Sequence, residues 1–186
     1  MNSSAVTWTD EELMALPRDG SKRELIGGEI IMSPAGFDHE RLGARLLTSL
    51  SNHVERHALG VVCGSSLGCR MANGDVLSPD VSFIVKERIP RSNEASRRFF
   101  PGAPDLVAEI LSPFDTLAKT RRKLQDYFEN GTRLAWVLNP DEKSVLIYRT
   151  PFAEKLLRGA DTMDGEDVVP GFRLALAGLF ADPGAL

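Results

Sequence analysis

The sequence has little of what marks a secreted or membrane protein. Only 2 of its 186 residues are cysteines, Cys63 and Cys69, which is too few for a disulfide framework and fits a reducing compartment. No apolar run approaches the ~20 residues that a membrane-spanning helix needs. Met1 to Asp10 lacks the charged start and apolar core of a signal peptide. We therefore predict a cytoplasmic protein that does not associate with membranes.

Familiar catalytic motifs are also missing. The sequence contains neither the G-x-x-x-x-G-K-S/T motif of P-loop proteins nor the G-x-G-x-x-G motif of dinucleotide-binding proteins. Ser65 and Ser66 follow Gly64 but lack the strand-to-helix context of an α/β-hydrolase nucleophile. These observations argue against three large classes of enzyme.

A strongly basic composition is absent as well. The net charge is −4 and the pI is about 5.4, whereas a domain that holds nucleic acid by bulk charge typically has a pI above ~9. The charge is uneven, because residues 86–133 carry 10 basic and 7 acidic residues while residues 1–85 and 134–186 are net negative. A polyanion is therefore expected to approach the middle of the chain. An enzyme that acts on a polyanion through an acidic metal site stays compatible with this composition.

The pattern of apolar residues predicts one domain over residues 1–186, with a mixed α/β fold around one sheet. A capping box at Thr9 and Glu12 opens a short first helix. Further helices are predicted at 38–58, 116–130 and 174–180. Strands are predicted at 22–26, 29–32, 61–63, 67–71, 81–85, 106–111, 134–138 and 145–148, with one or two edge strands in the tail. Residues 86–102 are predicted to form an arginine-rich loop.

Acidic residues at two apolar strands are the first candidates for a site. Asp80 opens the strand at 81–85, and Glu109 lies inside the apolar strand at 106–111. Buried acids are costly unless they are paired or bind a metal, so two of them on neighbouring strands predict a site for a hard cation such as Mg²⁺. Glu24 in the first hairpin is a candidate third acid. The alternative for Glu109 and Glu24 is a solvent-facing position.

The helix predicted at 116–130 supplies the cations Lys119, Arg121, Arg122 and Lys123. Lys123 lies beside the apolar stripe of this helix, which directs it toward the sheet edge near Glu109, where an ammonium group can orient a water molecule and offset charge on a phosphate oxygen. A solvated helix face is the alternative for Lys123. Further candidate phosphate contacts are the loop arginines Arg88, Arg91, Arg97 and Arg98, with a solvated loop as the alternative.

A zinc site is a competing use of four other residues. His53 and His57 have the i,i+4 spacing of a ligand pair on a helix. Cys63 and Cys69, however, are spaced too loosely for a zinc knuckle, and both histidines lie at the exposed helix end. We therefore favour structural roles for the two cysteines.

Five segments together form a recognisable pattern: Glu24-Leu-Ile-Gly-Gly-Glu29, Met32-Ser-Pro34 followed by His39, Ser78-Pro-Asp80-Val, Pro104-Asp-Leu-Val-Ala-Glu109-Ile-Leu-Ser-Pro113, and Lys123…Tyr127…Gly131…Trp136-Val-Leu-Asn-Pro140. Over residues 8–180 the chain resembles the Uma-two family, a bacterial group classed with restriction endonucleases in the PD-(D/E)xK nuclease superfamily. The resemblance implies a restriction endonuclease-like core, with a mixed central sheet flanked by helices.

The resemblance also implies roles for the acids and the lysine. Asp80 and Glu109 would be the first and second metal-binding acids, with the Ile110 carbonyl as a further ligand of Mg²⁺, for which Mn²⁺ would substitute. The superfamily's usual lysine position, two residues after Glu109, is occupied by Leu111. The family places its lysine on the next helix instead, and Lys123 corresponds to it.

Glu24 corresponds to an acid that the first element supplies in many superfamily members, and His39 to a family histidine near the start of the long helix. The alternative for His39 is a capping or packing role. Proposed contacts to nucleic acid are Arg97, Arg98, Lys119 and Arg122.

The implied reaction is metal-assisted hydrolysis of DNA phosphodiester bonds that leaves a 3′-hydroxyl and a 5′-phosphate. We expect a homodimer, because cutting both strands usually needs two sites. Two other hypotheses stay open: a catalytically silent nucleic-acid-binding or interaction protein of the same fold, and an unrelated α/β enzyme or structural protein.

Overall fold

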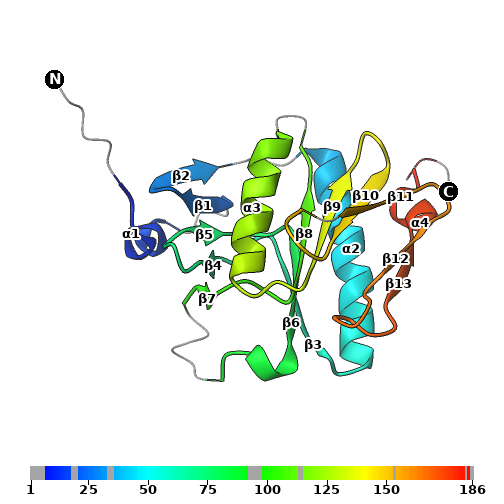
Figure 1. The fold of residues 1–186 in the computed structure, drawn as a ribbon, viewed down its shortest axis with the longest axis horizontal. Coiled ribbons are helices and arrows are strands. Elements are labelled where there is room, and N and C mark those ends of the chain that lie inside the picture. The colour runs from blue at the N-terminus through cyan, green and yellow to red at the C-terminus, as the bar shows by residue number, and fades with distance from the viewer. Residues whose placement is uncertain are drawn as a thin grey trace.

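The computed structural model describes residues 7–17, 21–32, 36–91, 98–112, 115–152, 154–182 and 184. Its largest sheet has six strands in the order β11-β10-β9-β8-β6-β3 (Figure 1). The strands are β3 (Gly60–Gly64), β6 (Val81–Val85), β8 (Leu106–Ile110), β9 (Leu134–Asn139), β10 (Ser144–Tyr148) and β11 (Glu154–Arg158). Strands β8 and β9 are parallel, and the other neighbours run antiparallel. The sheet is therefore mixed, as the sequence predicts.

Two long helices cover the two faces of this sheet, α2 (Phe37–Arg56) and α3 (Leu117–Glu129). Successive residues of a strand point to opposite faces, and β8 shows this clearly. Ala108 packs in the same core as Leu46 of α2, whereas Val107 packs in the other core with Leu124 of α3. Glu109 lies two residues after Val107 and therefore points to the side of α3.

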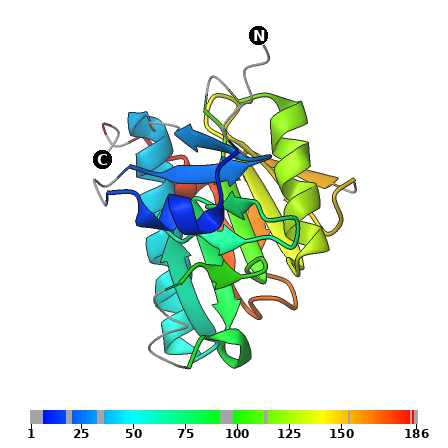
Figure 2. The same cartoon turned by 90° about the vertical axis from the view of Figure 1, so that its left-hand side faces the viewer.

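A second sheet lies beside the first and has five strands in the order β2-β1-β5-β4-β7. They are β1 (Arg23–Ile26), β2 (Glu29–Met32), β4 (Cys69–Arg70), β5 (Val76–Leu77) and β7 (Phe100–Pro101). Gly27 and Gly28 turn the chain between β1 and β2, with positive φ angles of 60° and 82°. In the view turned by 90°, this hairpin lies at the front of the molecule, with α2 on one side of it and α3 on the other (Figure 2).

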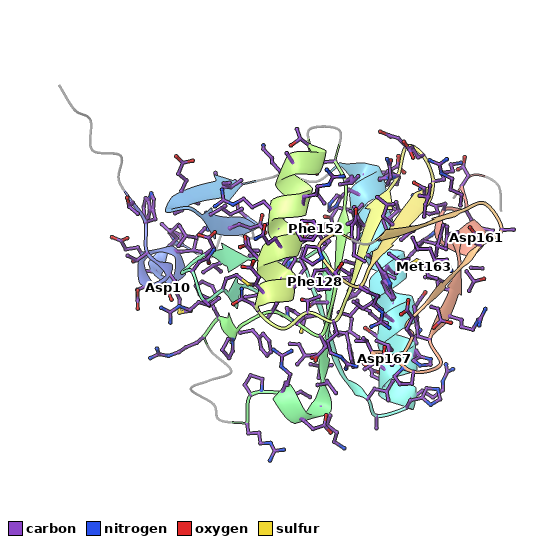
Figure 3. The ribbon with its side chains drawn as sticks, viewed as in Figure 1. Asp10, Phe128, Phe152, Asp161, Met163 and Asp167 are labelled. Atoms are coloured by element: carbon purple, nitrogen blue, oxygen red, sulfur yellow. The ribbon has the colours of Figure 1, made fainter. Side chains whose placement is uncertain are left out.

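The remaining elements are short. They are α1 (Asp10–Ala15), the 3₁₀ helix η1 (Lys86–Arg88), the paired strands β12 (Thr162–Asp164) and β13 (Arg173–Ala175), and α4 (Leu176–Leu179). Thr9 and Glu12 form the capping box that the sequence predicts for α1. Met163 of β12 is fully buried in the core under α2, whereas Phe152 is 85% exposed (Figure 3). No helix among the described residues is long and apolar enough to cross a membrane.

The prediction of one sheet is wrong, because the strands form three sheets. The sequence analysis does not predict β5 and β7, because these strands have two residues each and are too short to show an alternating pattern. Strand β7 lies inside the segment predicted as the loop 86–102, of which residues 92–97 lie outside the described residues. The tail holds three strands rather than one or two, and its helix begins only after β13.

Candidate active site

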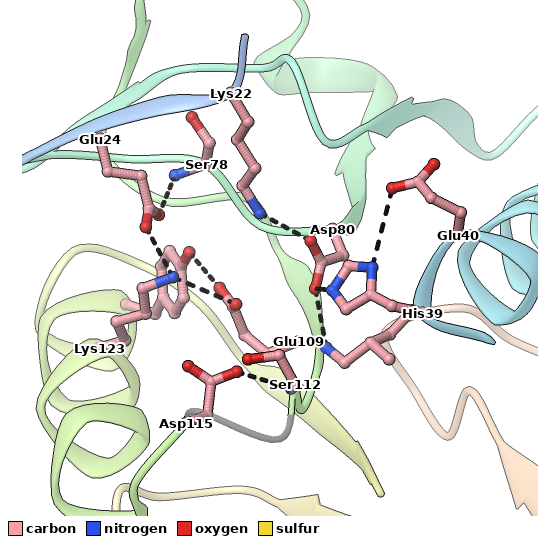
Figure 4. A network of polar contacts seen from close by, with 12 residues as sticks. Lys22, Glu24, His39, Glu40, Ser78, Asp80, Glu109, Ser112, Asp115 and Lys123 are labelled. Atoms are coloured by element: carbon pink, nitrogen blue, oxygen red, sulfur yellow. Dashed lines mark hydrogen bonds and ion pairs between the residues drawn. The ribbon is translucent and has the colours of Figure 1, made fainter. Parts of the chain in front are cut away.

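Three carboxylates are buried where the two larger sheets meet. Glu24 of β1, Asp80 before β6 and Glu109 of β8 are only 5%, 6% and 7% exposed. A buried carboxylate needs hydrogen bonds or opposite charges to offset its lost hydration. The structure supplies them from the segment just before β1, from α2 and α3, and from the backbone (Figure 4). The solvent-facing alternative for Glu24 and Glu109 is therefore wrong.

Asp80 receives three donors. Its Oδ1 accepts from Lys22 Nζ at 2.6 Å, and its Oδ2 accepts from the Ile110 backbone N–H at 2.8 Å and lies 3.1 Å from His39 Nε2. Burial alone would raise the pKa of Asp80, but the hydrogen bond with His39 and the charge of Lys22 hold the pKa well below its usual value. The carboxylate is therefore ionised at neutral pH and fixed in orientation.

Glu109 is held by α3. Its Oε1 accepts a 2.6 Å hydrogen bond from the Tyr127 hydroxyl, and its Oε2 lies 3.3 Å from Lys123 Nζ. Burial raises the pKa of Glu109 above its usual value, an effect that Lys123 opposes and the negative charge of Asp80 reinforces. The two acids therefore differ. The charged form of Asp80 is strongly stabilised, whereas burial makes the charged form of Glu109 less favourable than it is in water.

Lys123 joins two of the acids. Its Nζ lies 2.9 Å from Glu24 Oε2 and 3.3 Å from Glu109 Oε2. Burial alone would lower the pKa of Lys123, but Glu109 and Glu24 together raise it above the ordinary lysine value, so the ammonium stays charged. The other oxygen of Glu24 accepts from the Ser78 backbone N–H at 2.8 Å. Glu24 thus connects the lysine to the chain just before Asp80.

His39 lies in the first turn of α2 and contacts Asp80 rather than capping the helix, whose N-cap residue is Gly36. Burial alone would lower the pKa of His39, but the hydrogen bond to Asp80 raises it above the usual value. The other ring nitrogen, Nδ1, is buried without a hydrogen-bond partner among the described residues, with Glu40 Oε1 3.8 Å away.

The sequence reasoning missed Lys22, and it gave no role to Tyr127, which stands in the family pattern. Lys22 lies two residues before Glu24 in the same extended segment, and this spacing places both side chains on one face of the chain. Tyr127 lies four residues after Lys123, one helical turn along the same face of α3. The sequence therefore holds a sign of both roles: Lys22 stands at the strand spacing of two residues from Glu24, and Tyr127 stands at the helical spacing of four residues from Lys123.

Three of the four predicted contacts to nucleic acid are exposed side chains. Arg98, Lys119 and Arg122 are exposed, and Arg97 lies outside the described residues. Arg122 is 3.9 Å from Asp75. Arg88, another arginine of the predicted loop, has a structural role instead: it pairs with Asp105 at 3.1 Å and donates to the Ala103 carbonyl at 2.8 Å.

The donor set suits a hard cation in its chemistry. Asp80 and Glu109 offer carboxylate oxygens, the ligands that Mg²⁺ prefers. Both acids are paired with lysine here, and Ile110 contacts Asp80 through its N–H group. Among the described residues, no three histidine, cysteine, aspartate or glutamate side chains converge closely enough to hold a metal ion. Binding a cation between the acids therefore requires the local charge pairs to rearrange.

The alternative sites are not assembled. His53 Nε2 lies 3.0 Å from the Pro170 carbonyl, and Cys69 is fully buried. Within the described segments, these residues belong to no group of three histidine, cysteine, aspartate or glutamate side chains that could hold a metal ion. Ser65 and Ser66 lie in the turn after β3, followed by strand β4 rather than a helix, so the context of a hydrolase nucleophile is absent there.

Comparison with known proteins agrees with this fold. A solved structure of a "putative nuclease belonging to DUF820" from Anabaena variabilis superposes with a TM-score of 0.80 at 23% sequence identity, covering 93% of this chain and 97% of that chain. At this identity the likeness concerns the fold. No curated protein matches the sequence. The Uma2 family model, described as "Putative restriction endonuclease", matches residues 10–177. The chain therefore belongs to the Uma2 family.

Proposed function

We propose that this protein is a divalent-metal-dependent nuclease that hydrolyses DNA phosphodiester bonds. The observation that carries the proposal is the convergence of Asp80, Glu109 and Lys123 in one buried cluster. Membership of a restriction endonuclease-like family supports nuclease chemistry, and such families generally use divalent metals. Asp80 and Glu109, with the Ile110 carbonyl, would hold Mg²⁺ or Mn²⁺. The bound cation would polarise the phosphate and lower the pKa of a water molecule.

The other residues of the cluster position these groups. Lys123 would orient the attacking water and stabilise negative charge on the phosphate oxygens as the 3′-oxygen leaves. Glu24 fixes the Lys123 ammonium at 2.9 Å, and His39 orients the carboxylate of Asp80 from 3.1 Å. Because Glu24 and His39 hold Lys123 and Asp80 in this way, these two groups would lose little entropy when the phosphate arrives.

DNA would be held locally rather than by overall charge. The proposed phosphate contacts are Arg97, Arg98, Lys119 and Arg122, all within the one net-positive part of the chain, residues 86–133. Such contacts predict local, metal-dependent binding that weakens as the salt concentration rises. We also propose a homodimer, which would bring two sites to the two strands; sedimentation at enzyme concentrations used for cleavage tests this directly.

Nicking of supercoiled plasmid in Mg²⁺ or Mn²⁺ tests the proposal. Asp80→Ala and Glu109→Ala should each lower the rate by at least about a hundredfold, since each removes a proposed metal ligand. Glu29→Gln is the matched control, because Glu29 is an exposed acid on the neighbouring strand β2. Nicking that persists in both alanine variants would exclude this site as the catalytic centre. Circular dichroism establishes that each variant is folded.

A catalytically silent binding protein is the second candidate function. The observation that favours it is that Lys22 and Lys123 already neutralise the buried acids, so the cluster is stable without a cation. This alternative predicts DNA binding that is unchanged by EDTA, with no nicking on single- or double-stranded substrates. Cleavage that EDTA abolishes would rule it out.

A further inference from the structure

Lys22 is the member of the buried cluster to which neither the reaction nor the family pattern assigns a task. Its ammonium group contacts Asp80 Oδ1 at 2.6 Å, the shortest contact between a lysine and an acid in the cluster. The side chain is 20% exposed, whereas that of Asp80 is 4% exposed. The lysine thus enters from the solvent side and ends against a carboxylate that has almost no access to water.

The position of Lys22 is the position expected for a cation. Burial alone would lower the pKa of Lys22, but the charges of Glu109 and Asp80 and the hydrogen bond to Asp80 raise it above the usual lysine value. The ammonium group therefore interacts electrostatically with both proposed metal ligands. In Figure 4 it approaches Asp80 from the segment just before β1, away from the α3 side from which Lys123 approaches Glu109.

The two lysines differ in how firmly they are held. Lys123 pairs with Glu24 as well as with Glu109, so it keeps a carboxylate partner if Glu109 turns to a metal. Among the described residues, Asp80 is the acid that pairs with Lys22. Release of Lys22 therefore breaks one ion pair and returns a partly exposed side chain to water.

Charge balance also favours release of Lys22. With His39 neutral, Glu24, Asp80 and Glu109 carry three negative charges, and Lys22 and Lys123 carry two positive charges. A divalent cation added beside both lysines would leave an excess positive charge in a buried site, which is unfavourable at low dielectric. Exchange of Lys22 for the cation leaves the negative and positive charges equal.

We propose that Lys22 occupies the cation position beside Asp80 and that the divalent metal binds by exchange with its ammonium group. The inference rests on the proposed function, because it concerns the same acids. It makes Lys22 a competitor of the metal that also stabilises the metal-free protein, and it explains how two buried carboxylates persist before a cation arrives.

Calorimetric titration of the full chain with Mn²⁺ tests the exchange. We expect Lys22→Met to bind Mn²⁺ about tenfold more tightly than wild type or better, because the metal no longer displaces a bound ammonium group. Lys22→Arg keeps the charge and should bind close to wild type. Arg121→Met removes one exposed positive charge from α3 and should change affinity by less than about twofold, which separates exchange from long-range attraction.

Thermal unfolding provides a second measurement. Without metal, Lys22→Met should melt below wild type, and saturating Mn²⁺ should raise its melting temperature more than it raises that of wild type. Lys22→Gln, which is also uncharged but keeps a hydrogen-bond donor, replaces Lys22→Met in both experiments if the latter does not fold.

The outcomes separate the two proposals. Wild-type binding that Asp80→Asn abolishes but that Lys22→Met leaves equal or weaker would overturn the exchange alone and leave the metal-dependent nuclease standing. Absence of Mn²⁺ binding in both wild type and Lys22→Met would overturn the exchange together with the proposed metal site. Binding by Lys22→Met but not by wild type would support the exchange strongly.

Discussion

The hydroxyl group of Tyr127 offers a direct test of how Glu109 is kept charged inside the protein. It donates a 2.6 Å hydrogen bond to Glu109 Oε1, and the two residues are 0% and 7% exposed. Tyr127→Phe removes this donor at a position that water reaches poorly. Because a hydrogen bond to a charged group contributes roughly 1.5–3 kcal/mol, we expect the free energy of unfolding at pH 8 to fall by about 2 kcal/mol.

Urea unfolding followed by tryptophan fluorescence measures this loss, and a double-mutant cycle assigns it to Glu109. In the Glu109→Gln background the tyrosine donates to a neutral amide oxygen, so Tyr127→Phe should cost only about 1 kcal/mol. A Tyr127→Phe protein as stable as wild type would refute the reasoning. So would an equal loss in both backgrounds, because the effect would then be unrelated to the charge of Glu109.

Three further predictions concern the acids. Glu24→Gln should slow plasmid nicking by about tenfold or more with DNA affinity unchanged in a filter-binding assay, because Lys123 loses its 2.9 Å anchor. Glu109→Gln should unfold at higher urea than wild type at pH 7, because burial raises the pKa of Glu109 and a neutral side chain avoids that cost; equal or lower stability would contradict this. The pKa of Asp80 is lowered on folding, so its contribution to stability is present above the ordinary value of 3.8 and is lost as the pH falls below it. Acid titration of Asp80→Asn should therefore show a shallower loss of stability below about pH 4 than wild type.

The acids of the site were visible in the sequence because they violate a local pattern. Glu109 interrupts the apolar strand β8, and Asp80 opens the apolar strand β6. A charge in such a run carries a desolvation cost, which makes it conspicuous without any knowledge of its partners. The structure shows the partners, and both acids lie within one network of hydrogen bonds and ion pairs.

The cations were harder to identify because a lysine in a polar stretch violates no pattern. Lys22 stands between Ser21 and Arg23 and looks like an ordinary surface residue. Its place in the site depends on β1 lying beside the chain that leads into β6, which is a long-range feature. Lys123 was singled out because it lies beside the apolar stripe of α3, and the family resemblance then implied its role as the family's lysine.

The division into sheets depended on similar long-range pairing. The division depends on the pairing of short strands. Strand β1, for example, pairs with β5 through one residue pair, Leu25 with Val76. A two-residue strand contains too few positions for any periodicity, so its existence follows from the neighbour it pairs with. The long elements α2, α3, β6 and β8 were predictable because each shows its own pattern over several residues.

The placement of the cluster at the junction of the two sheets gives it a structural consequence as well. Glu109, Lys123 and Tyr127 come from the continuous unit of β8 and α3, and they pair within that unit. Glu24 lies in β1 and Lys22 directly precedes this strand; Lys22 pairs with Asp80, and Glu24 pairs with Lys123. Detachment of the β1–β2 hairpin would therefore remove the counter-ion of Asp80 and the anchor of Lys123 together. The charge pairs that would position the reacting groups thus also hold the β1–β2 hairpin against the rest of the cluster. The geometry of the site and the docking of the hairpin therefore depend on each other.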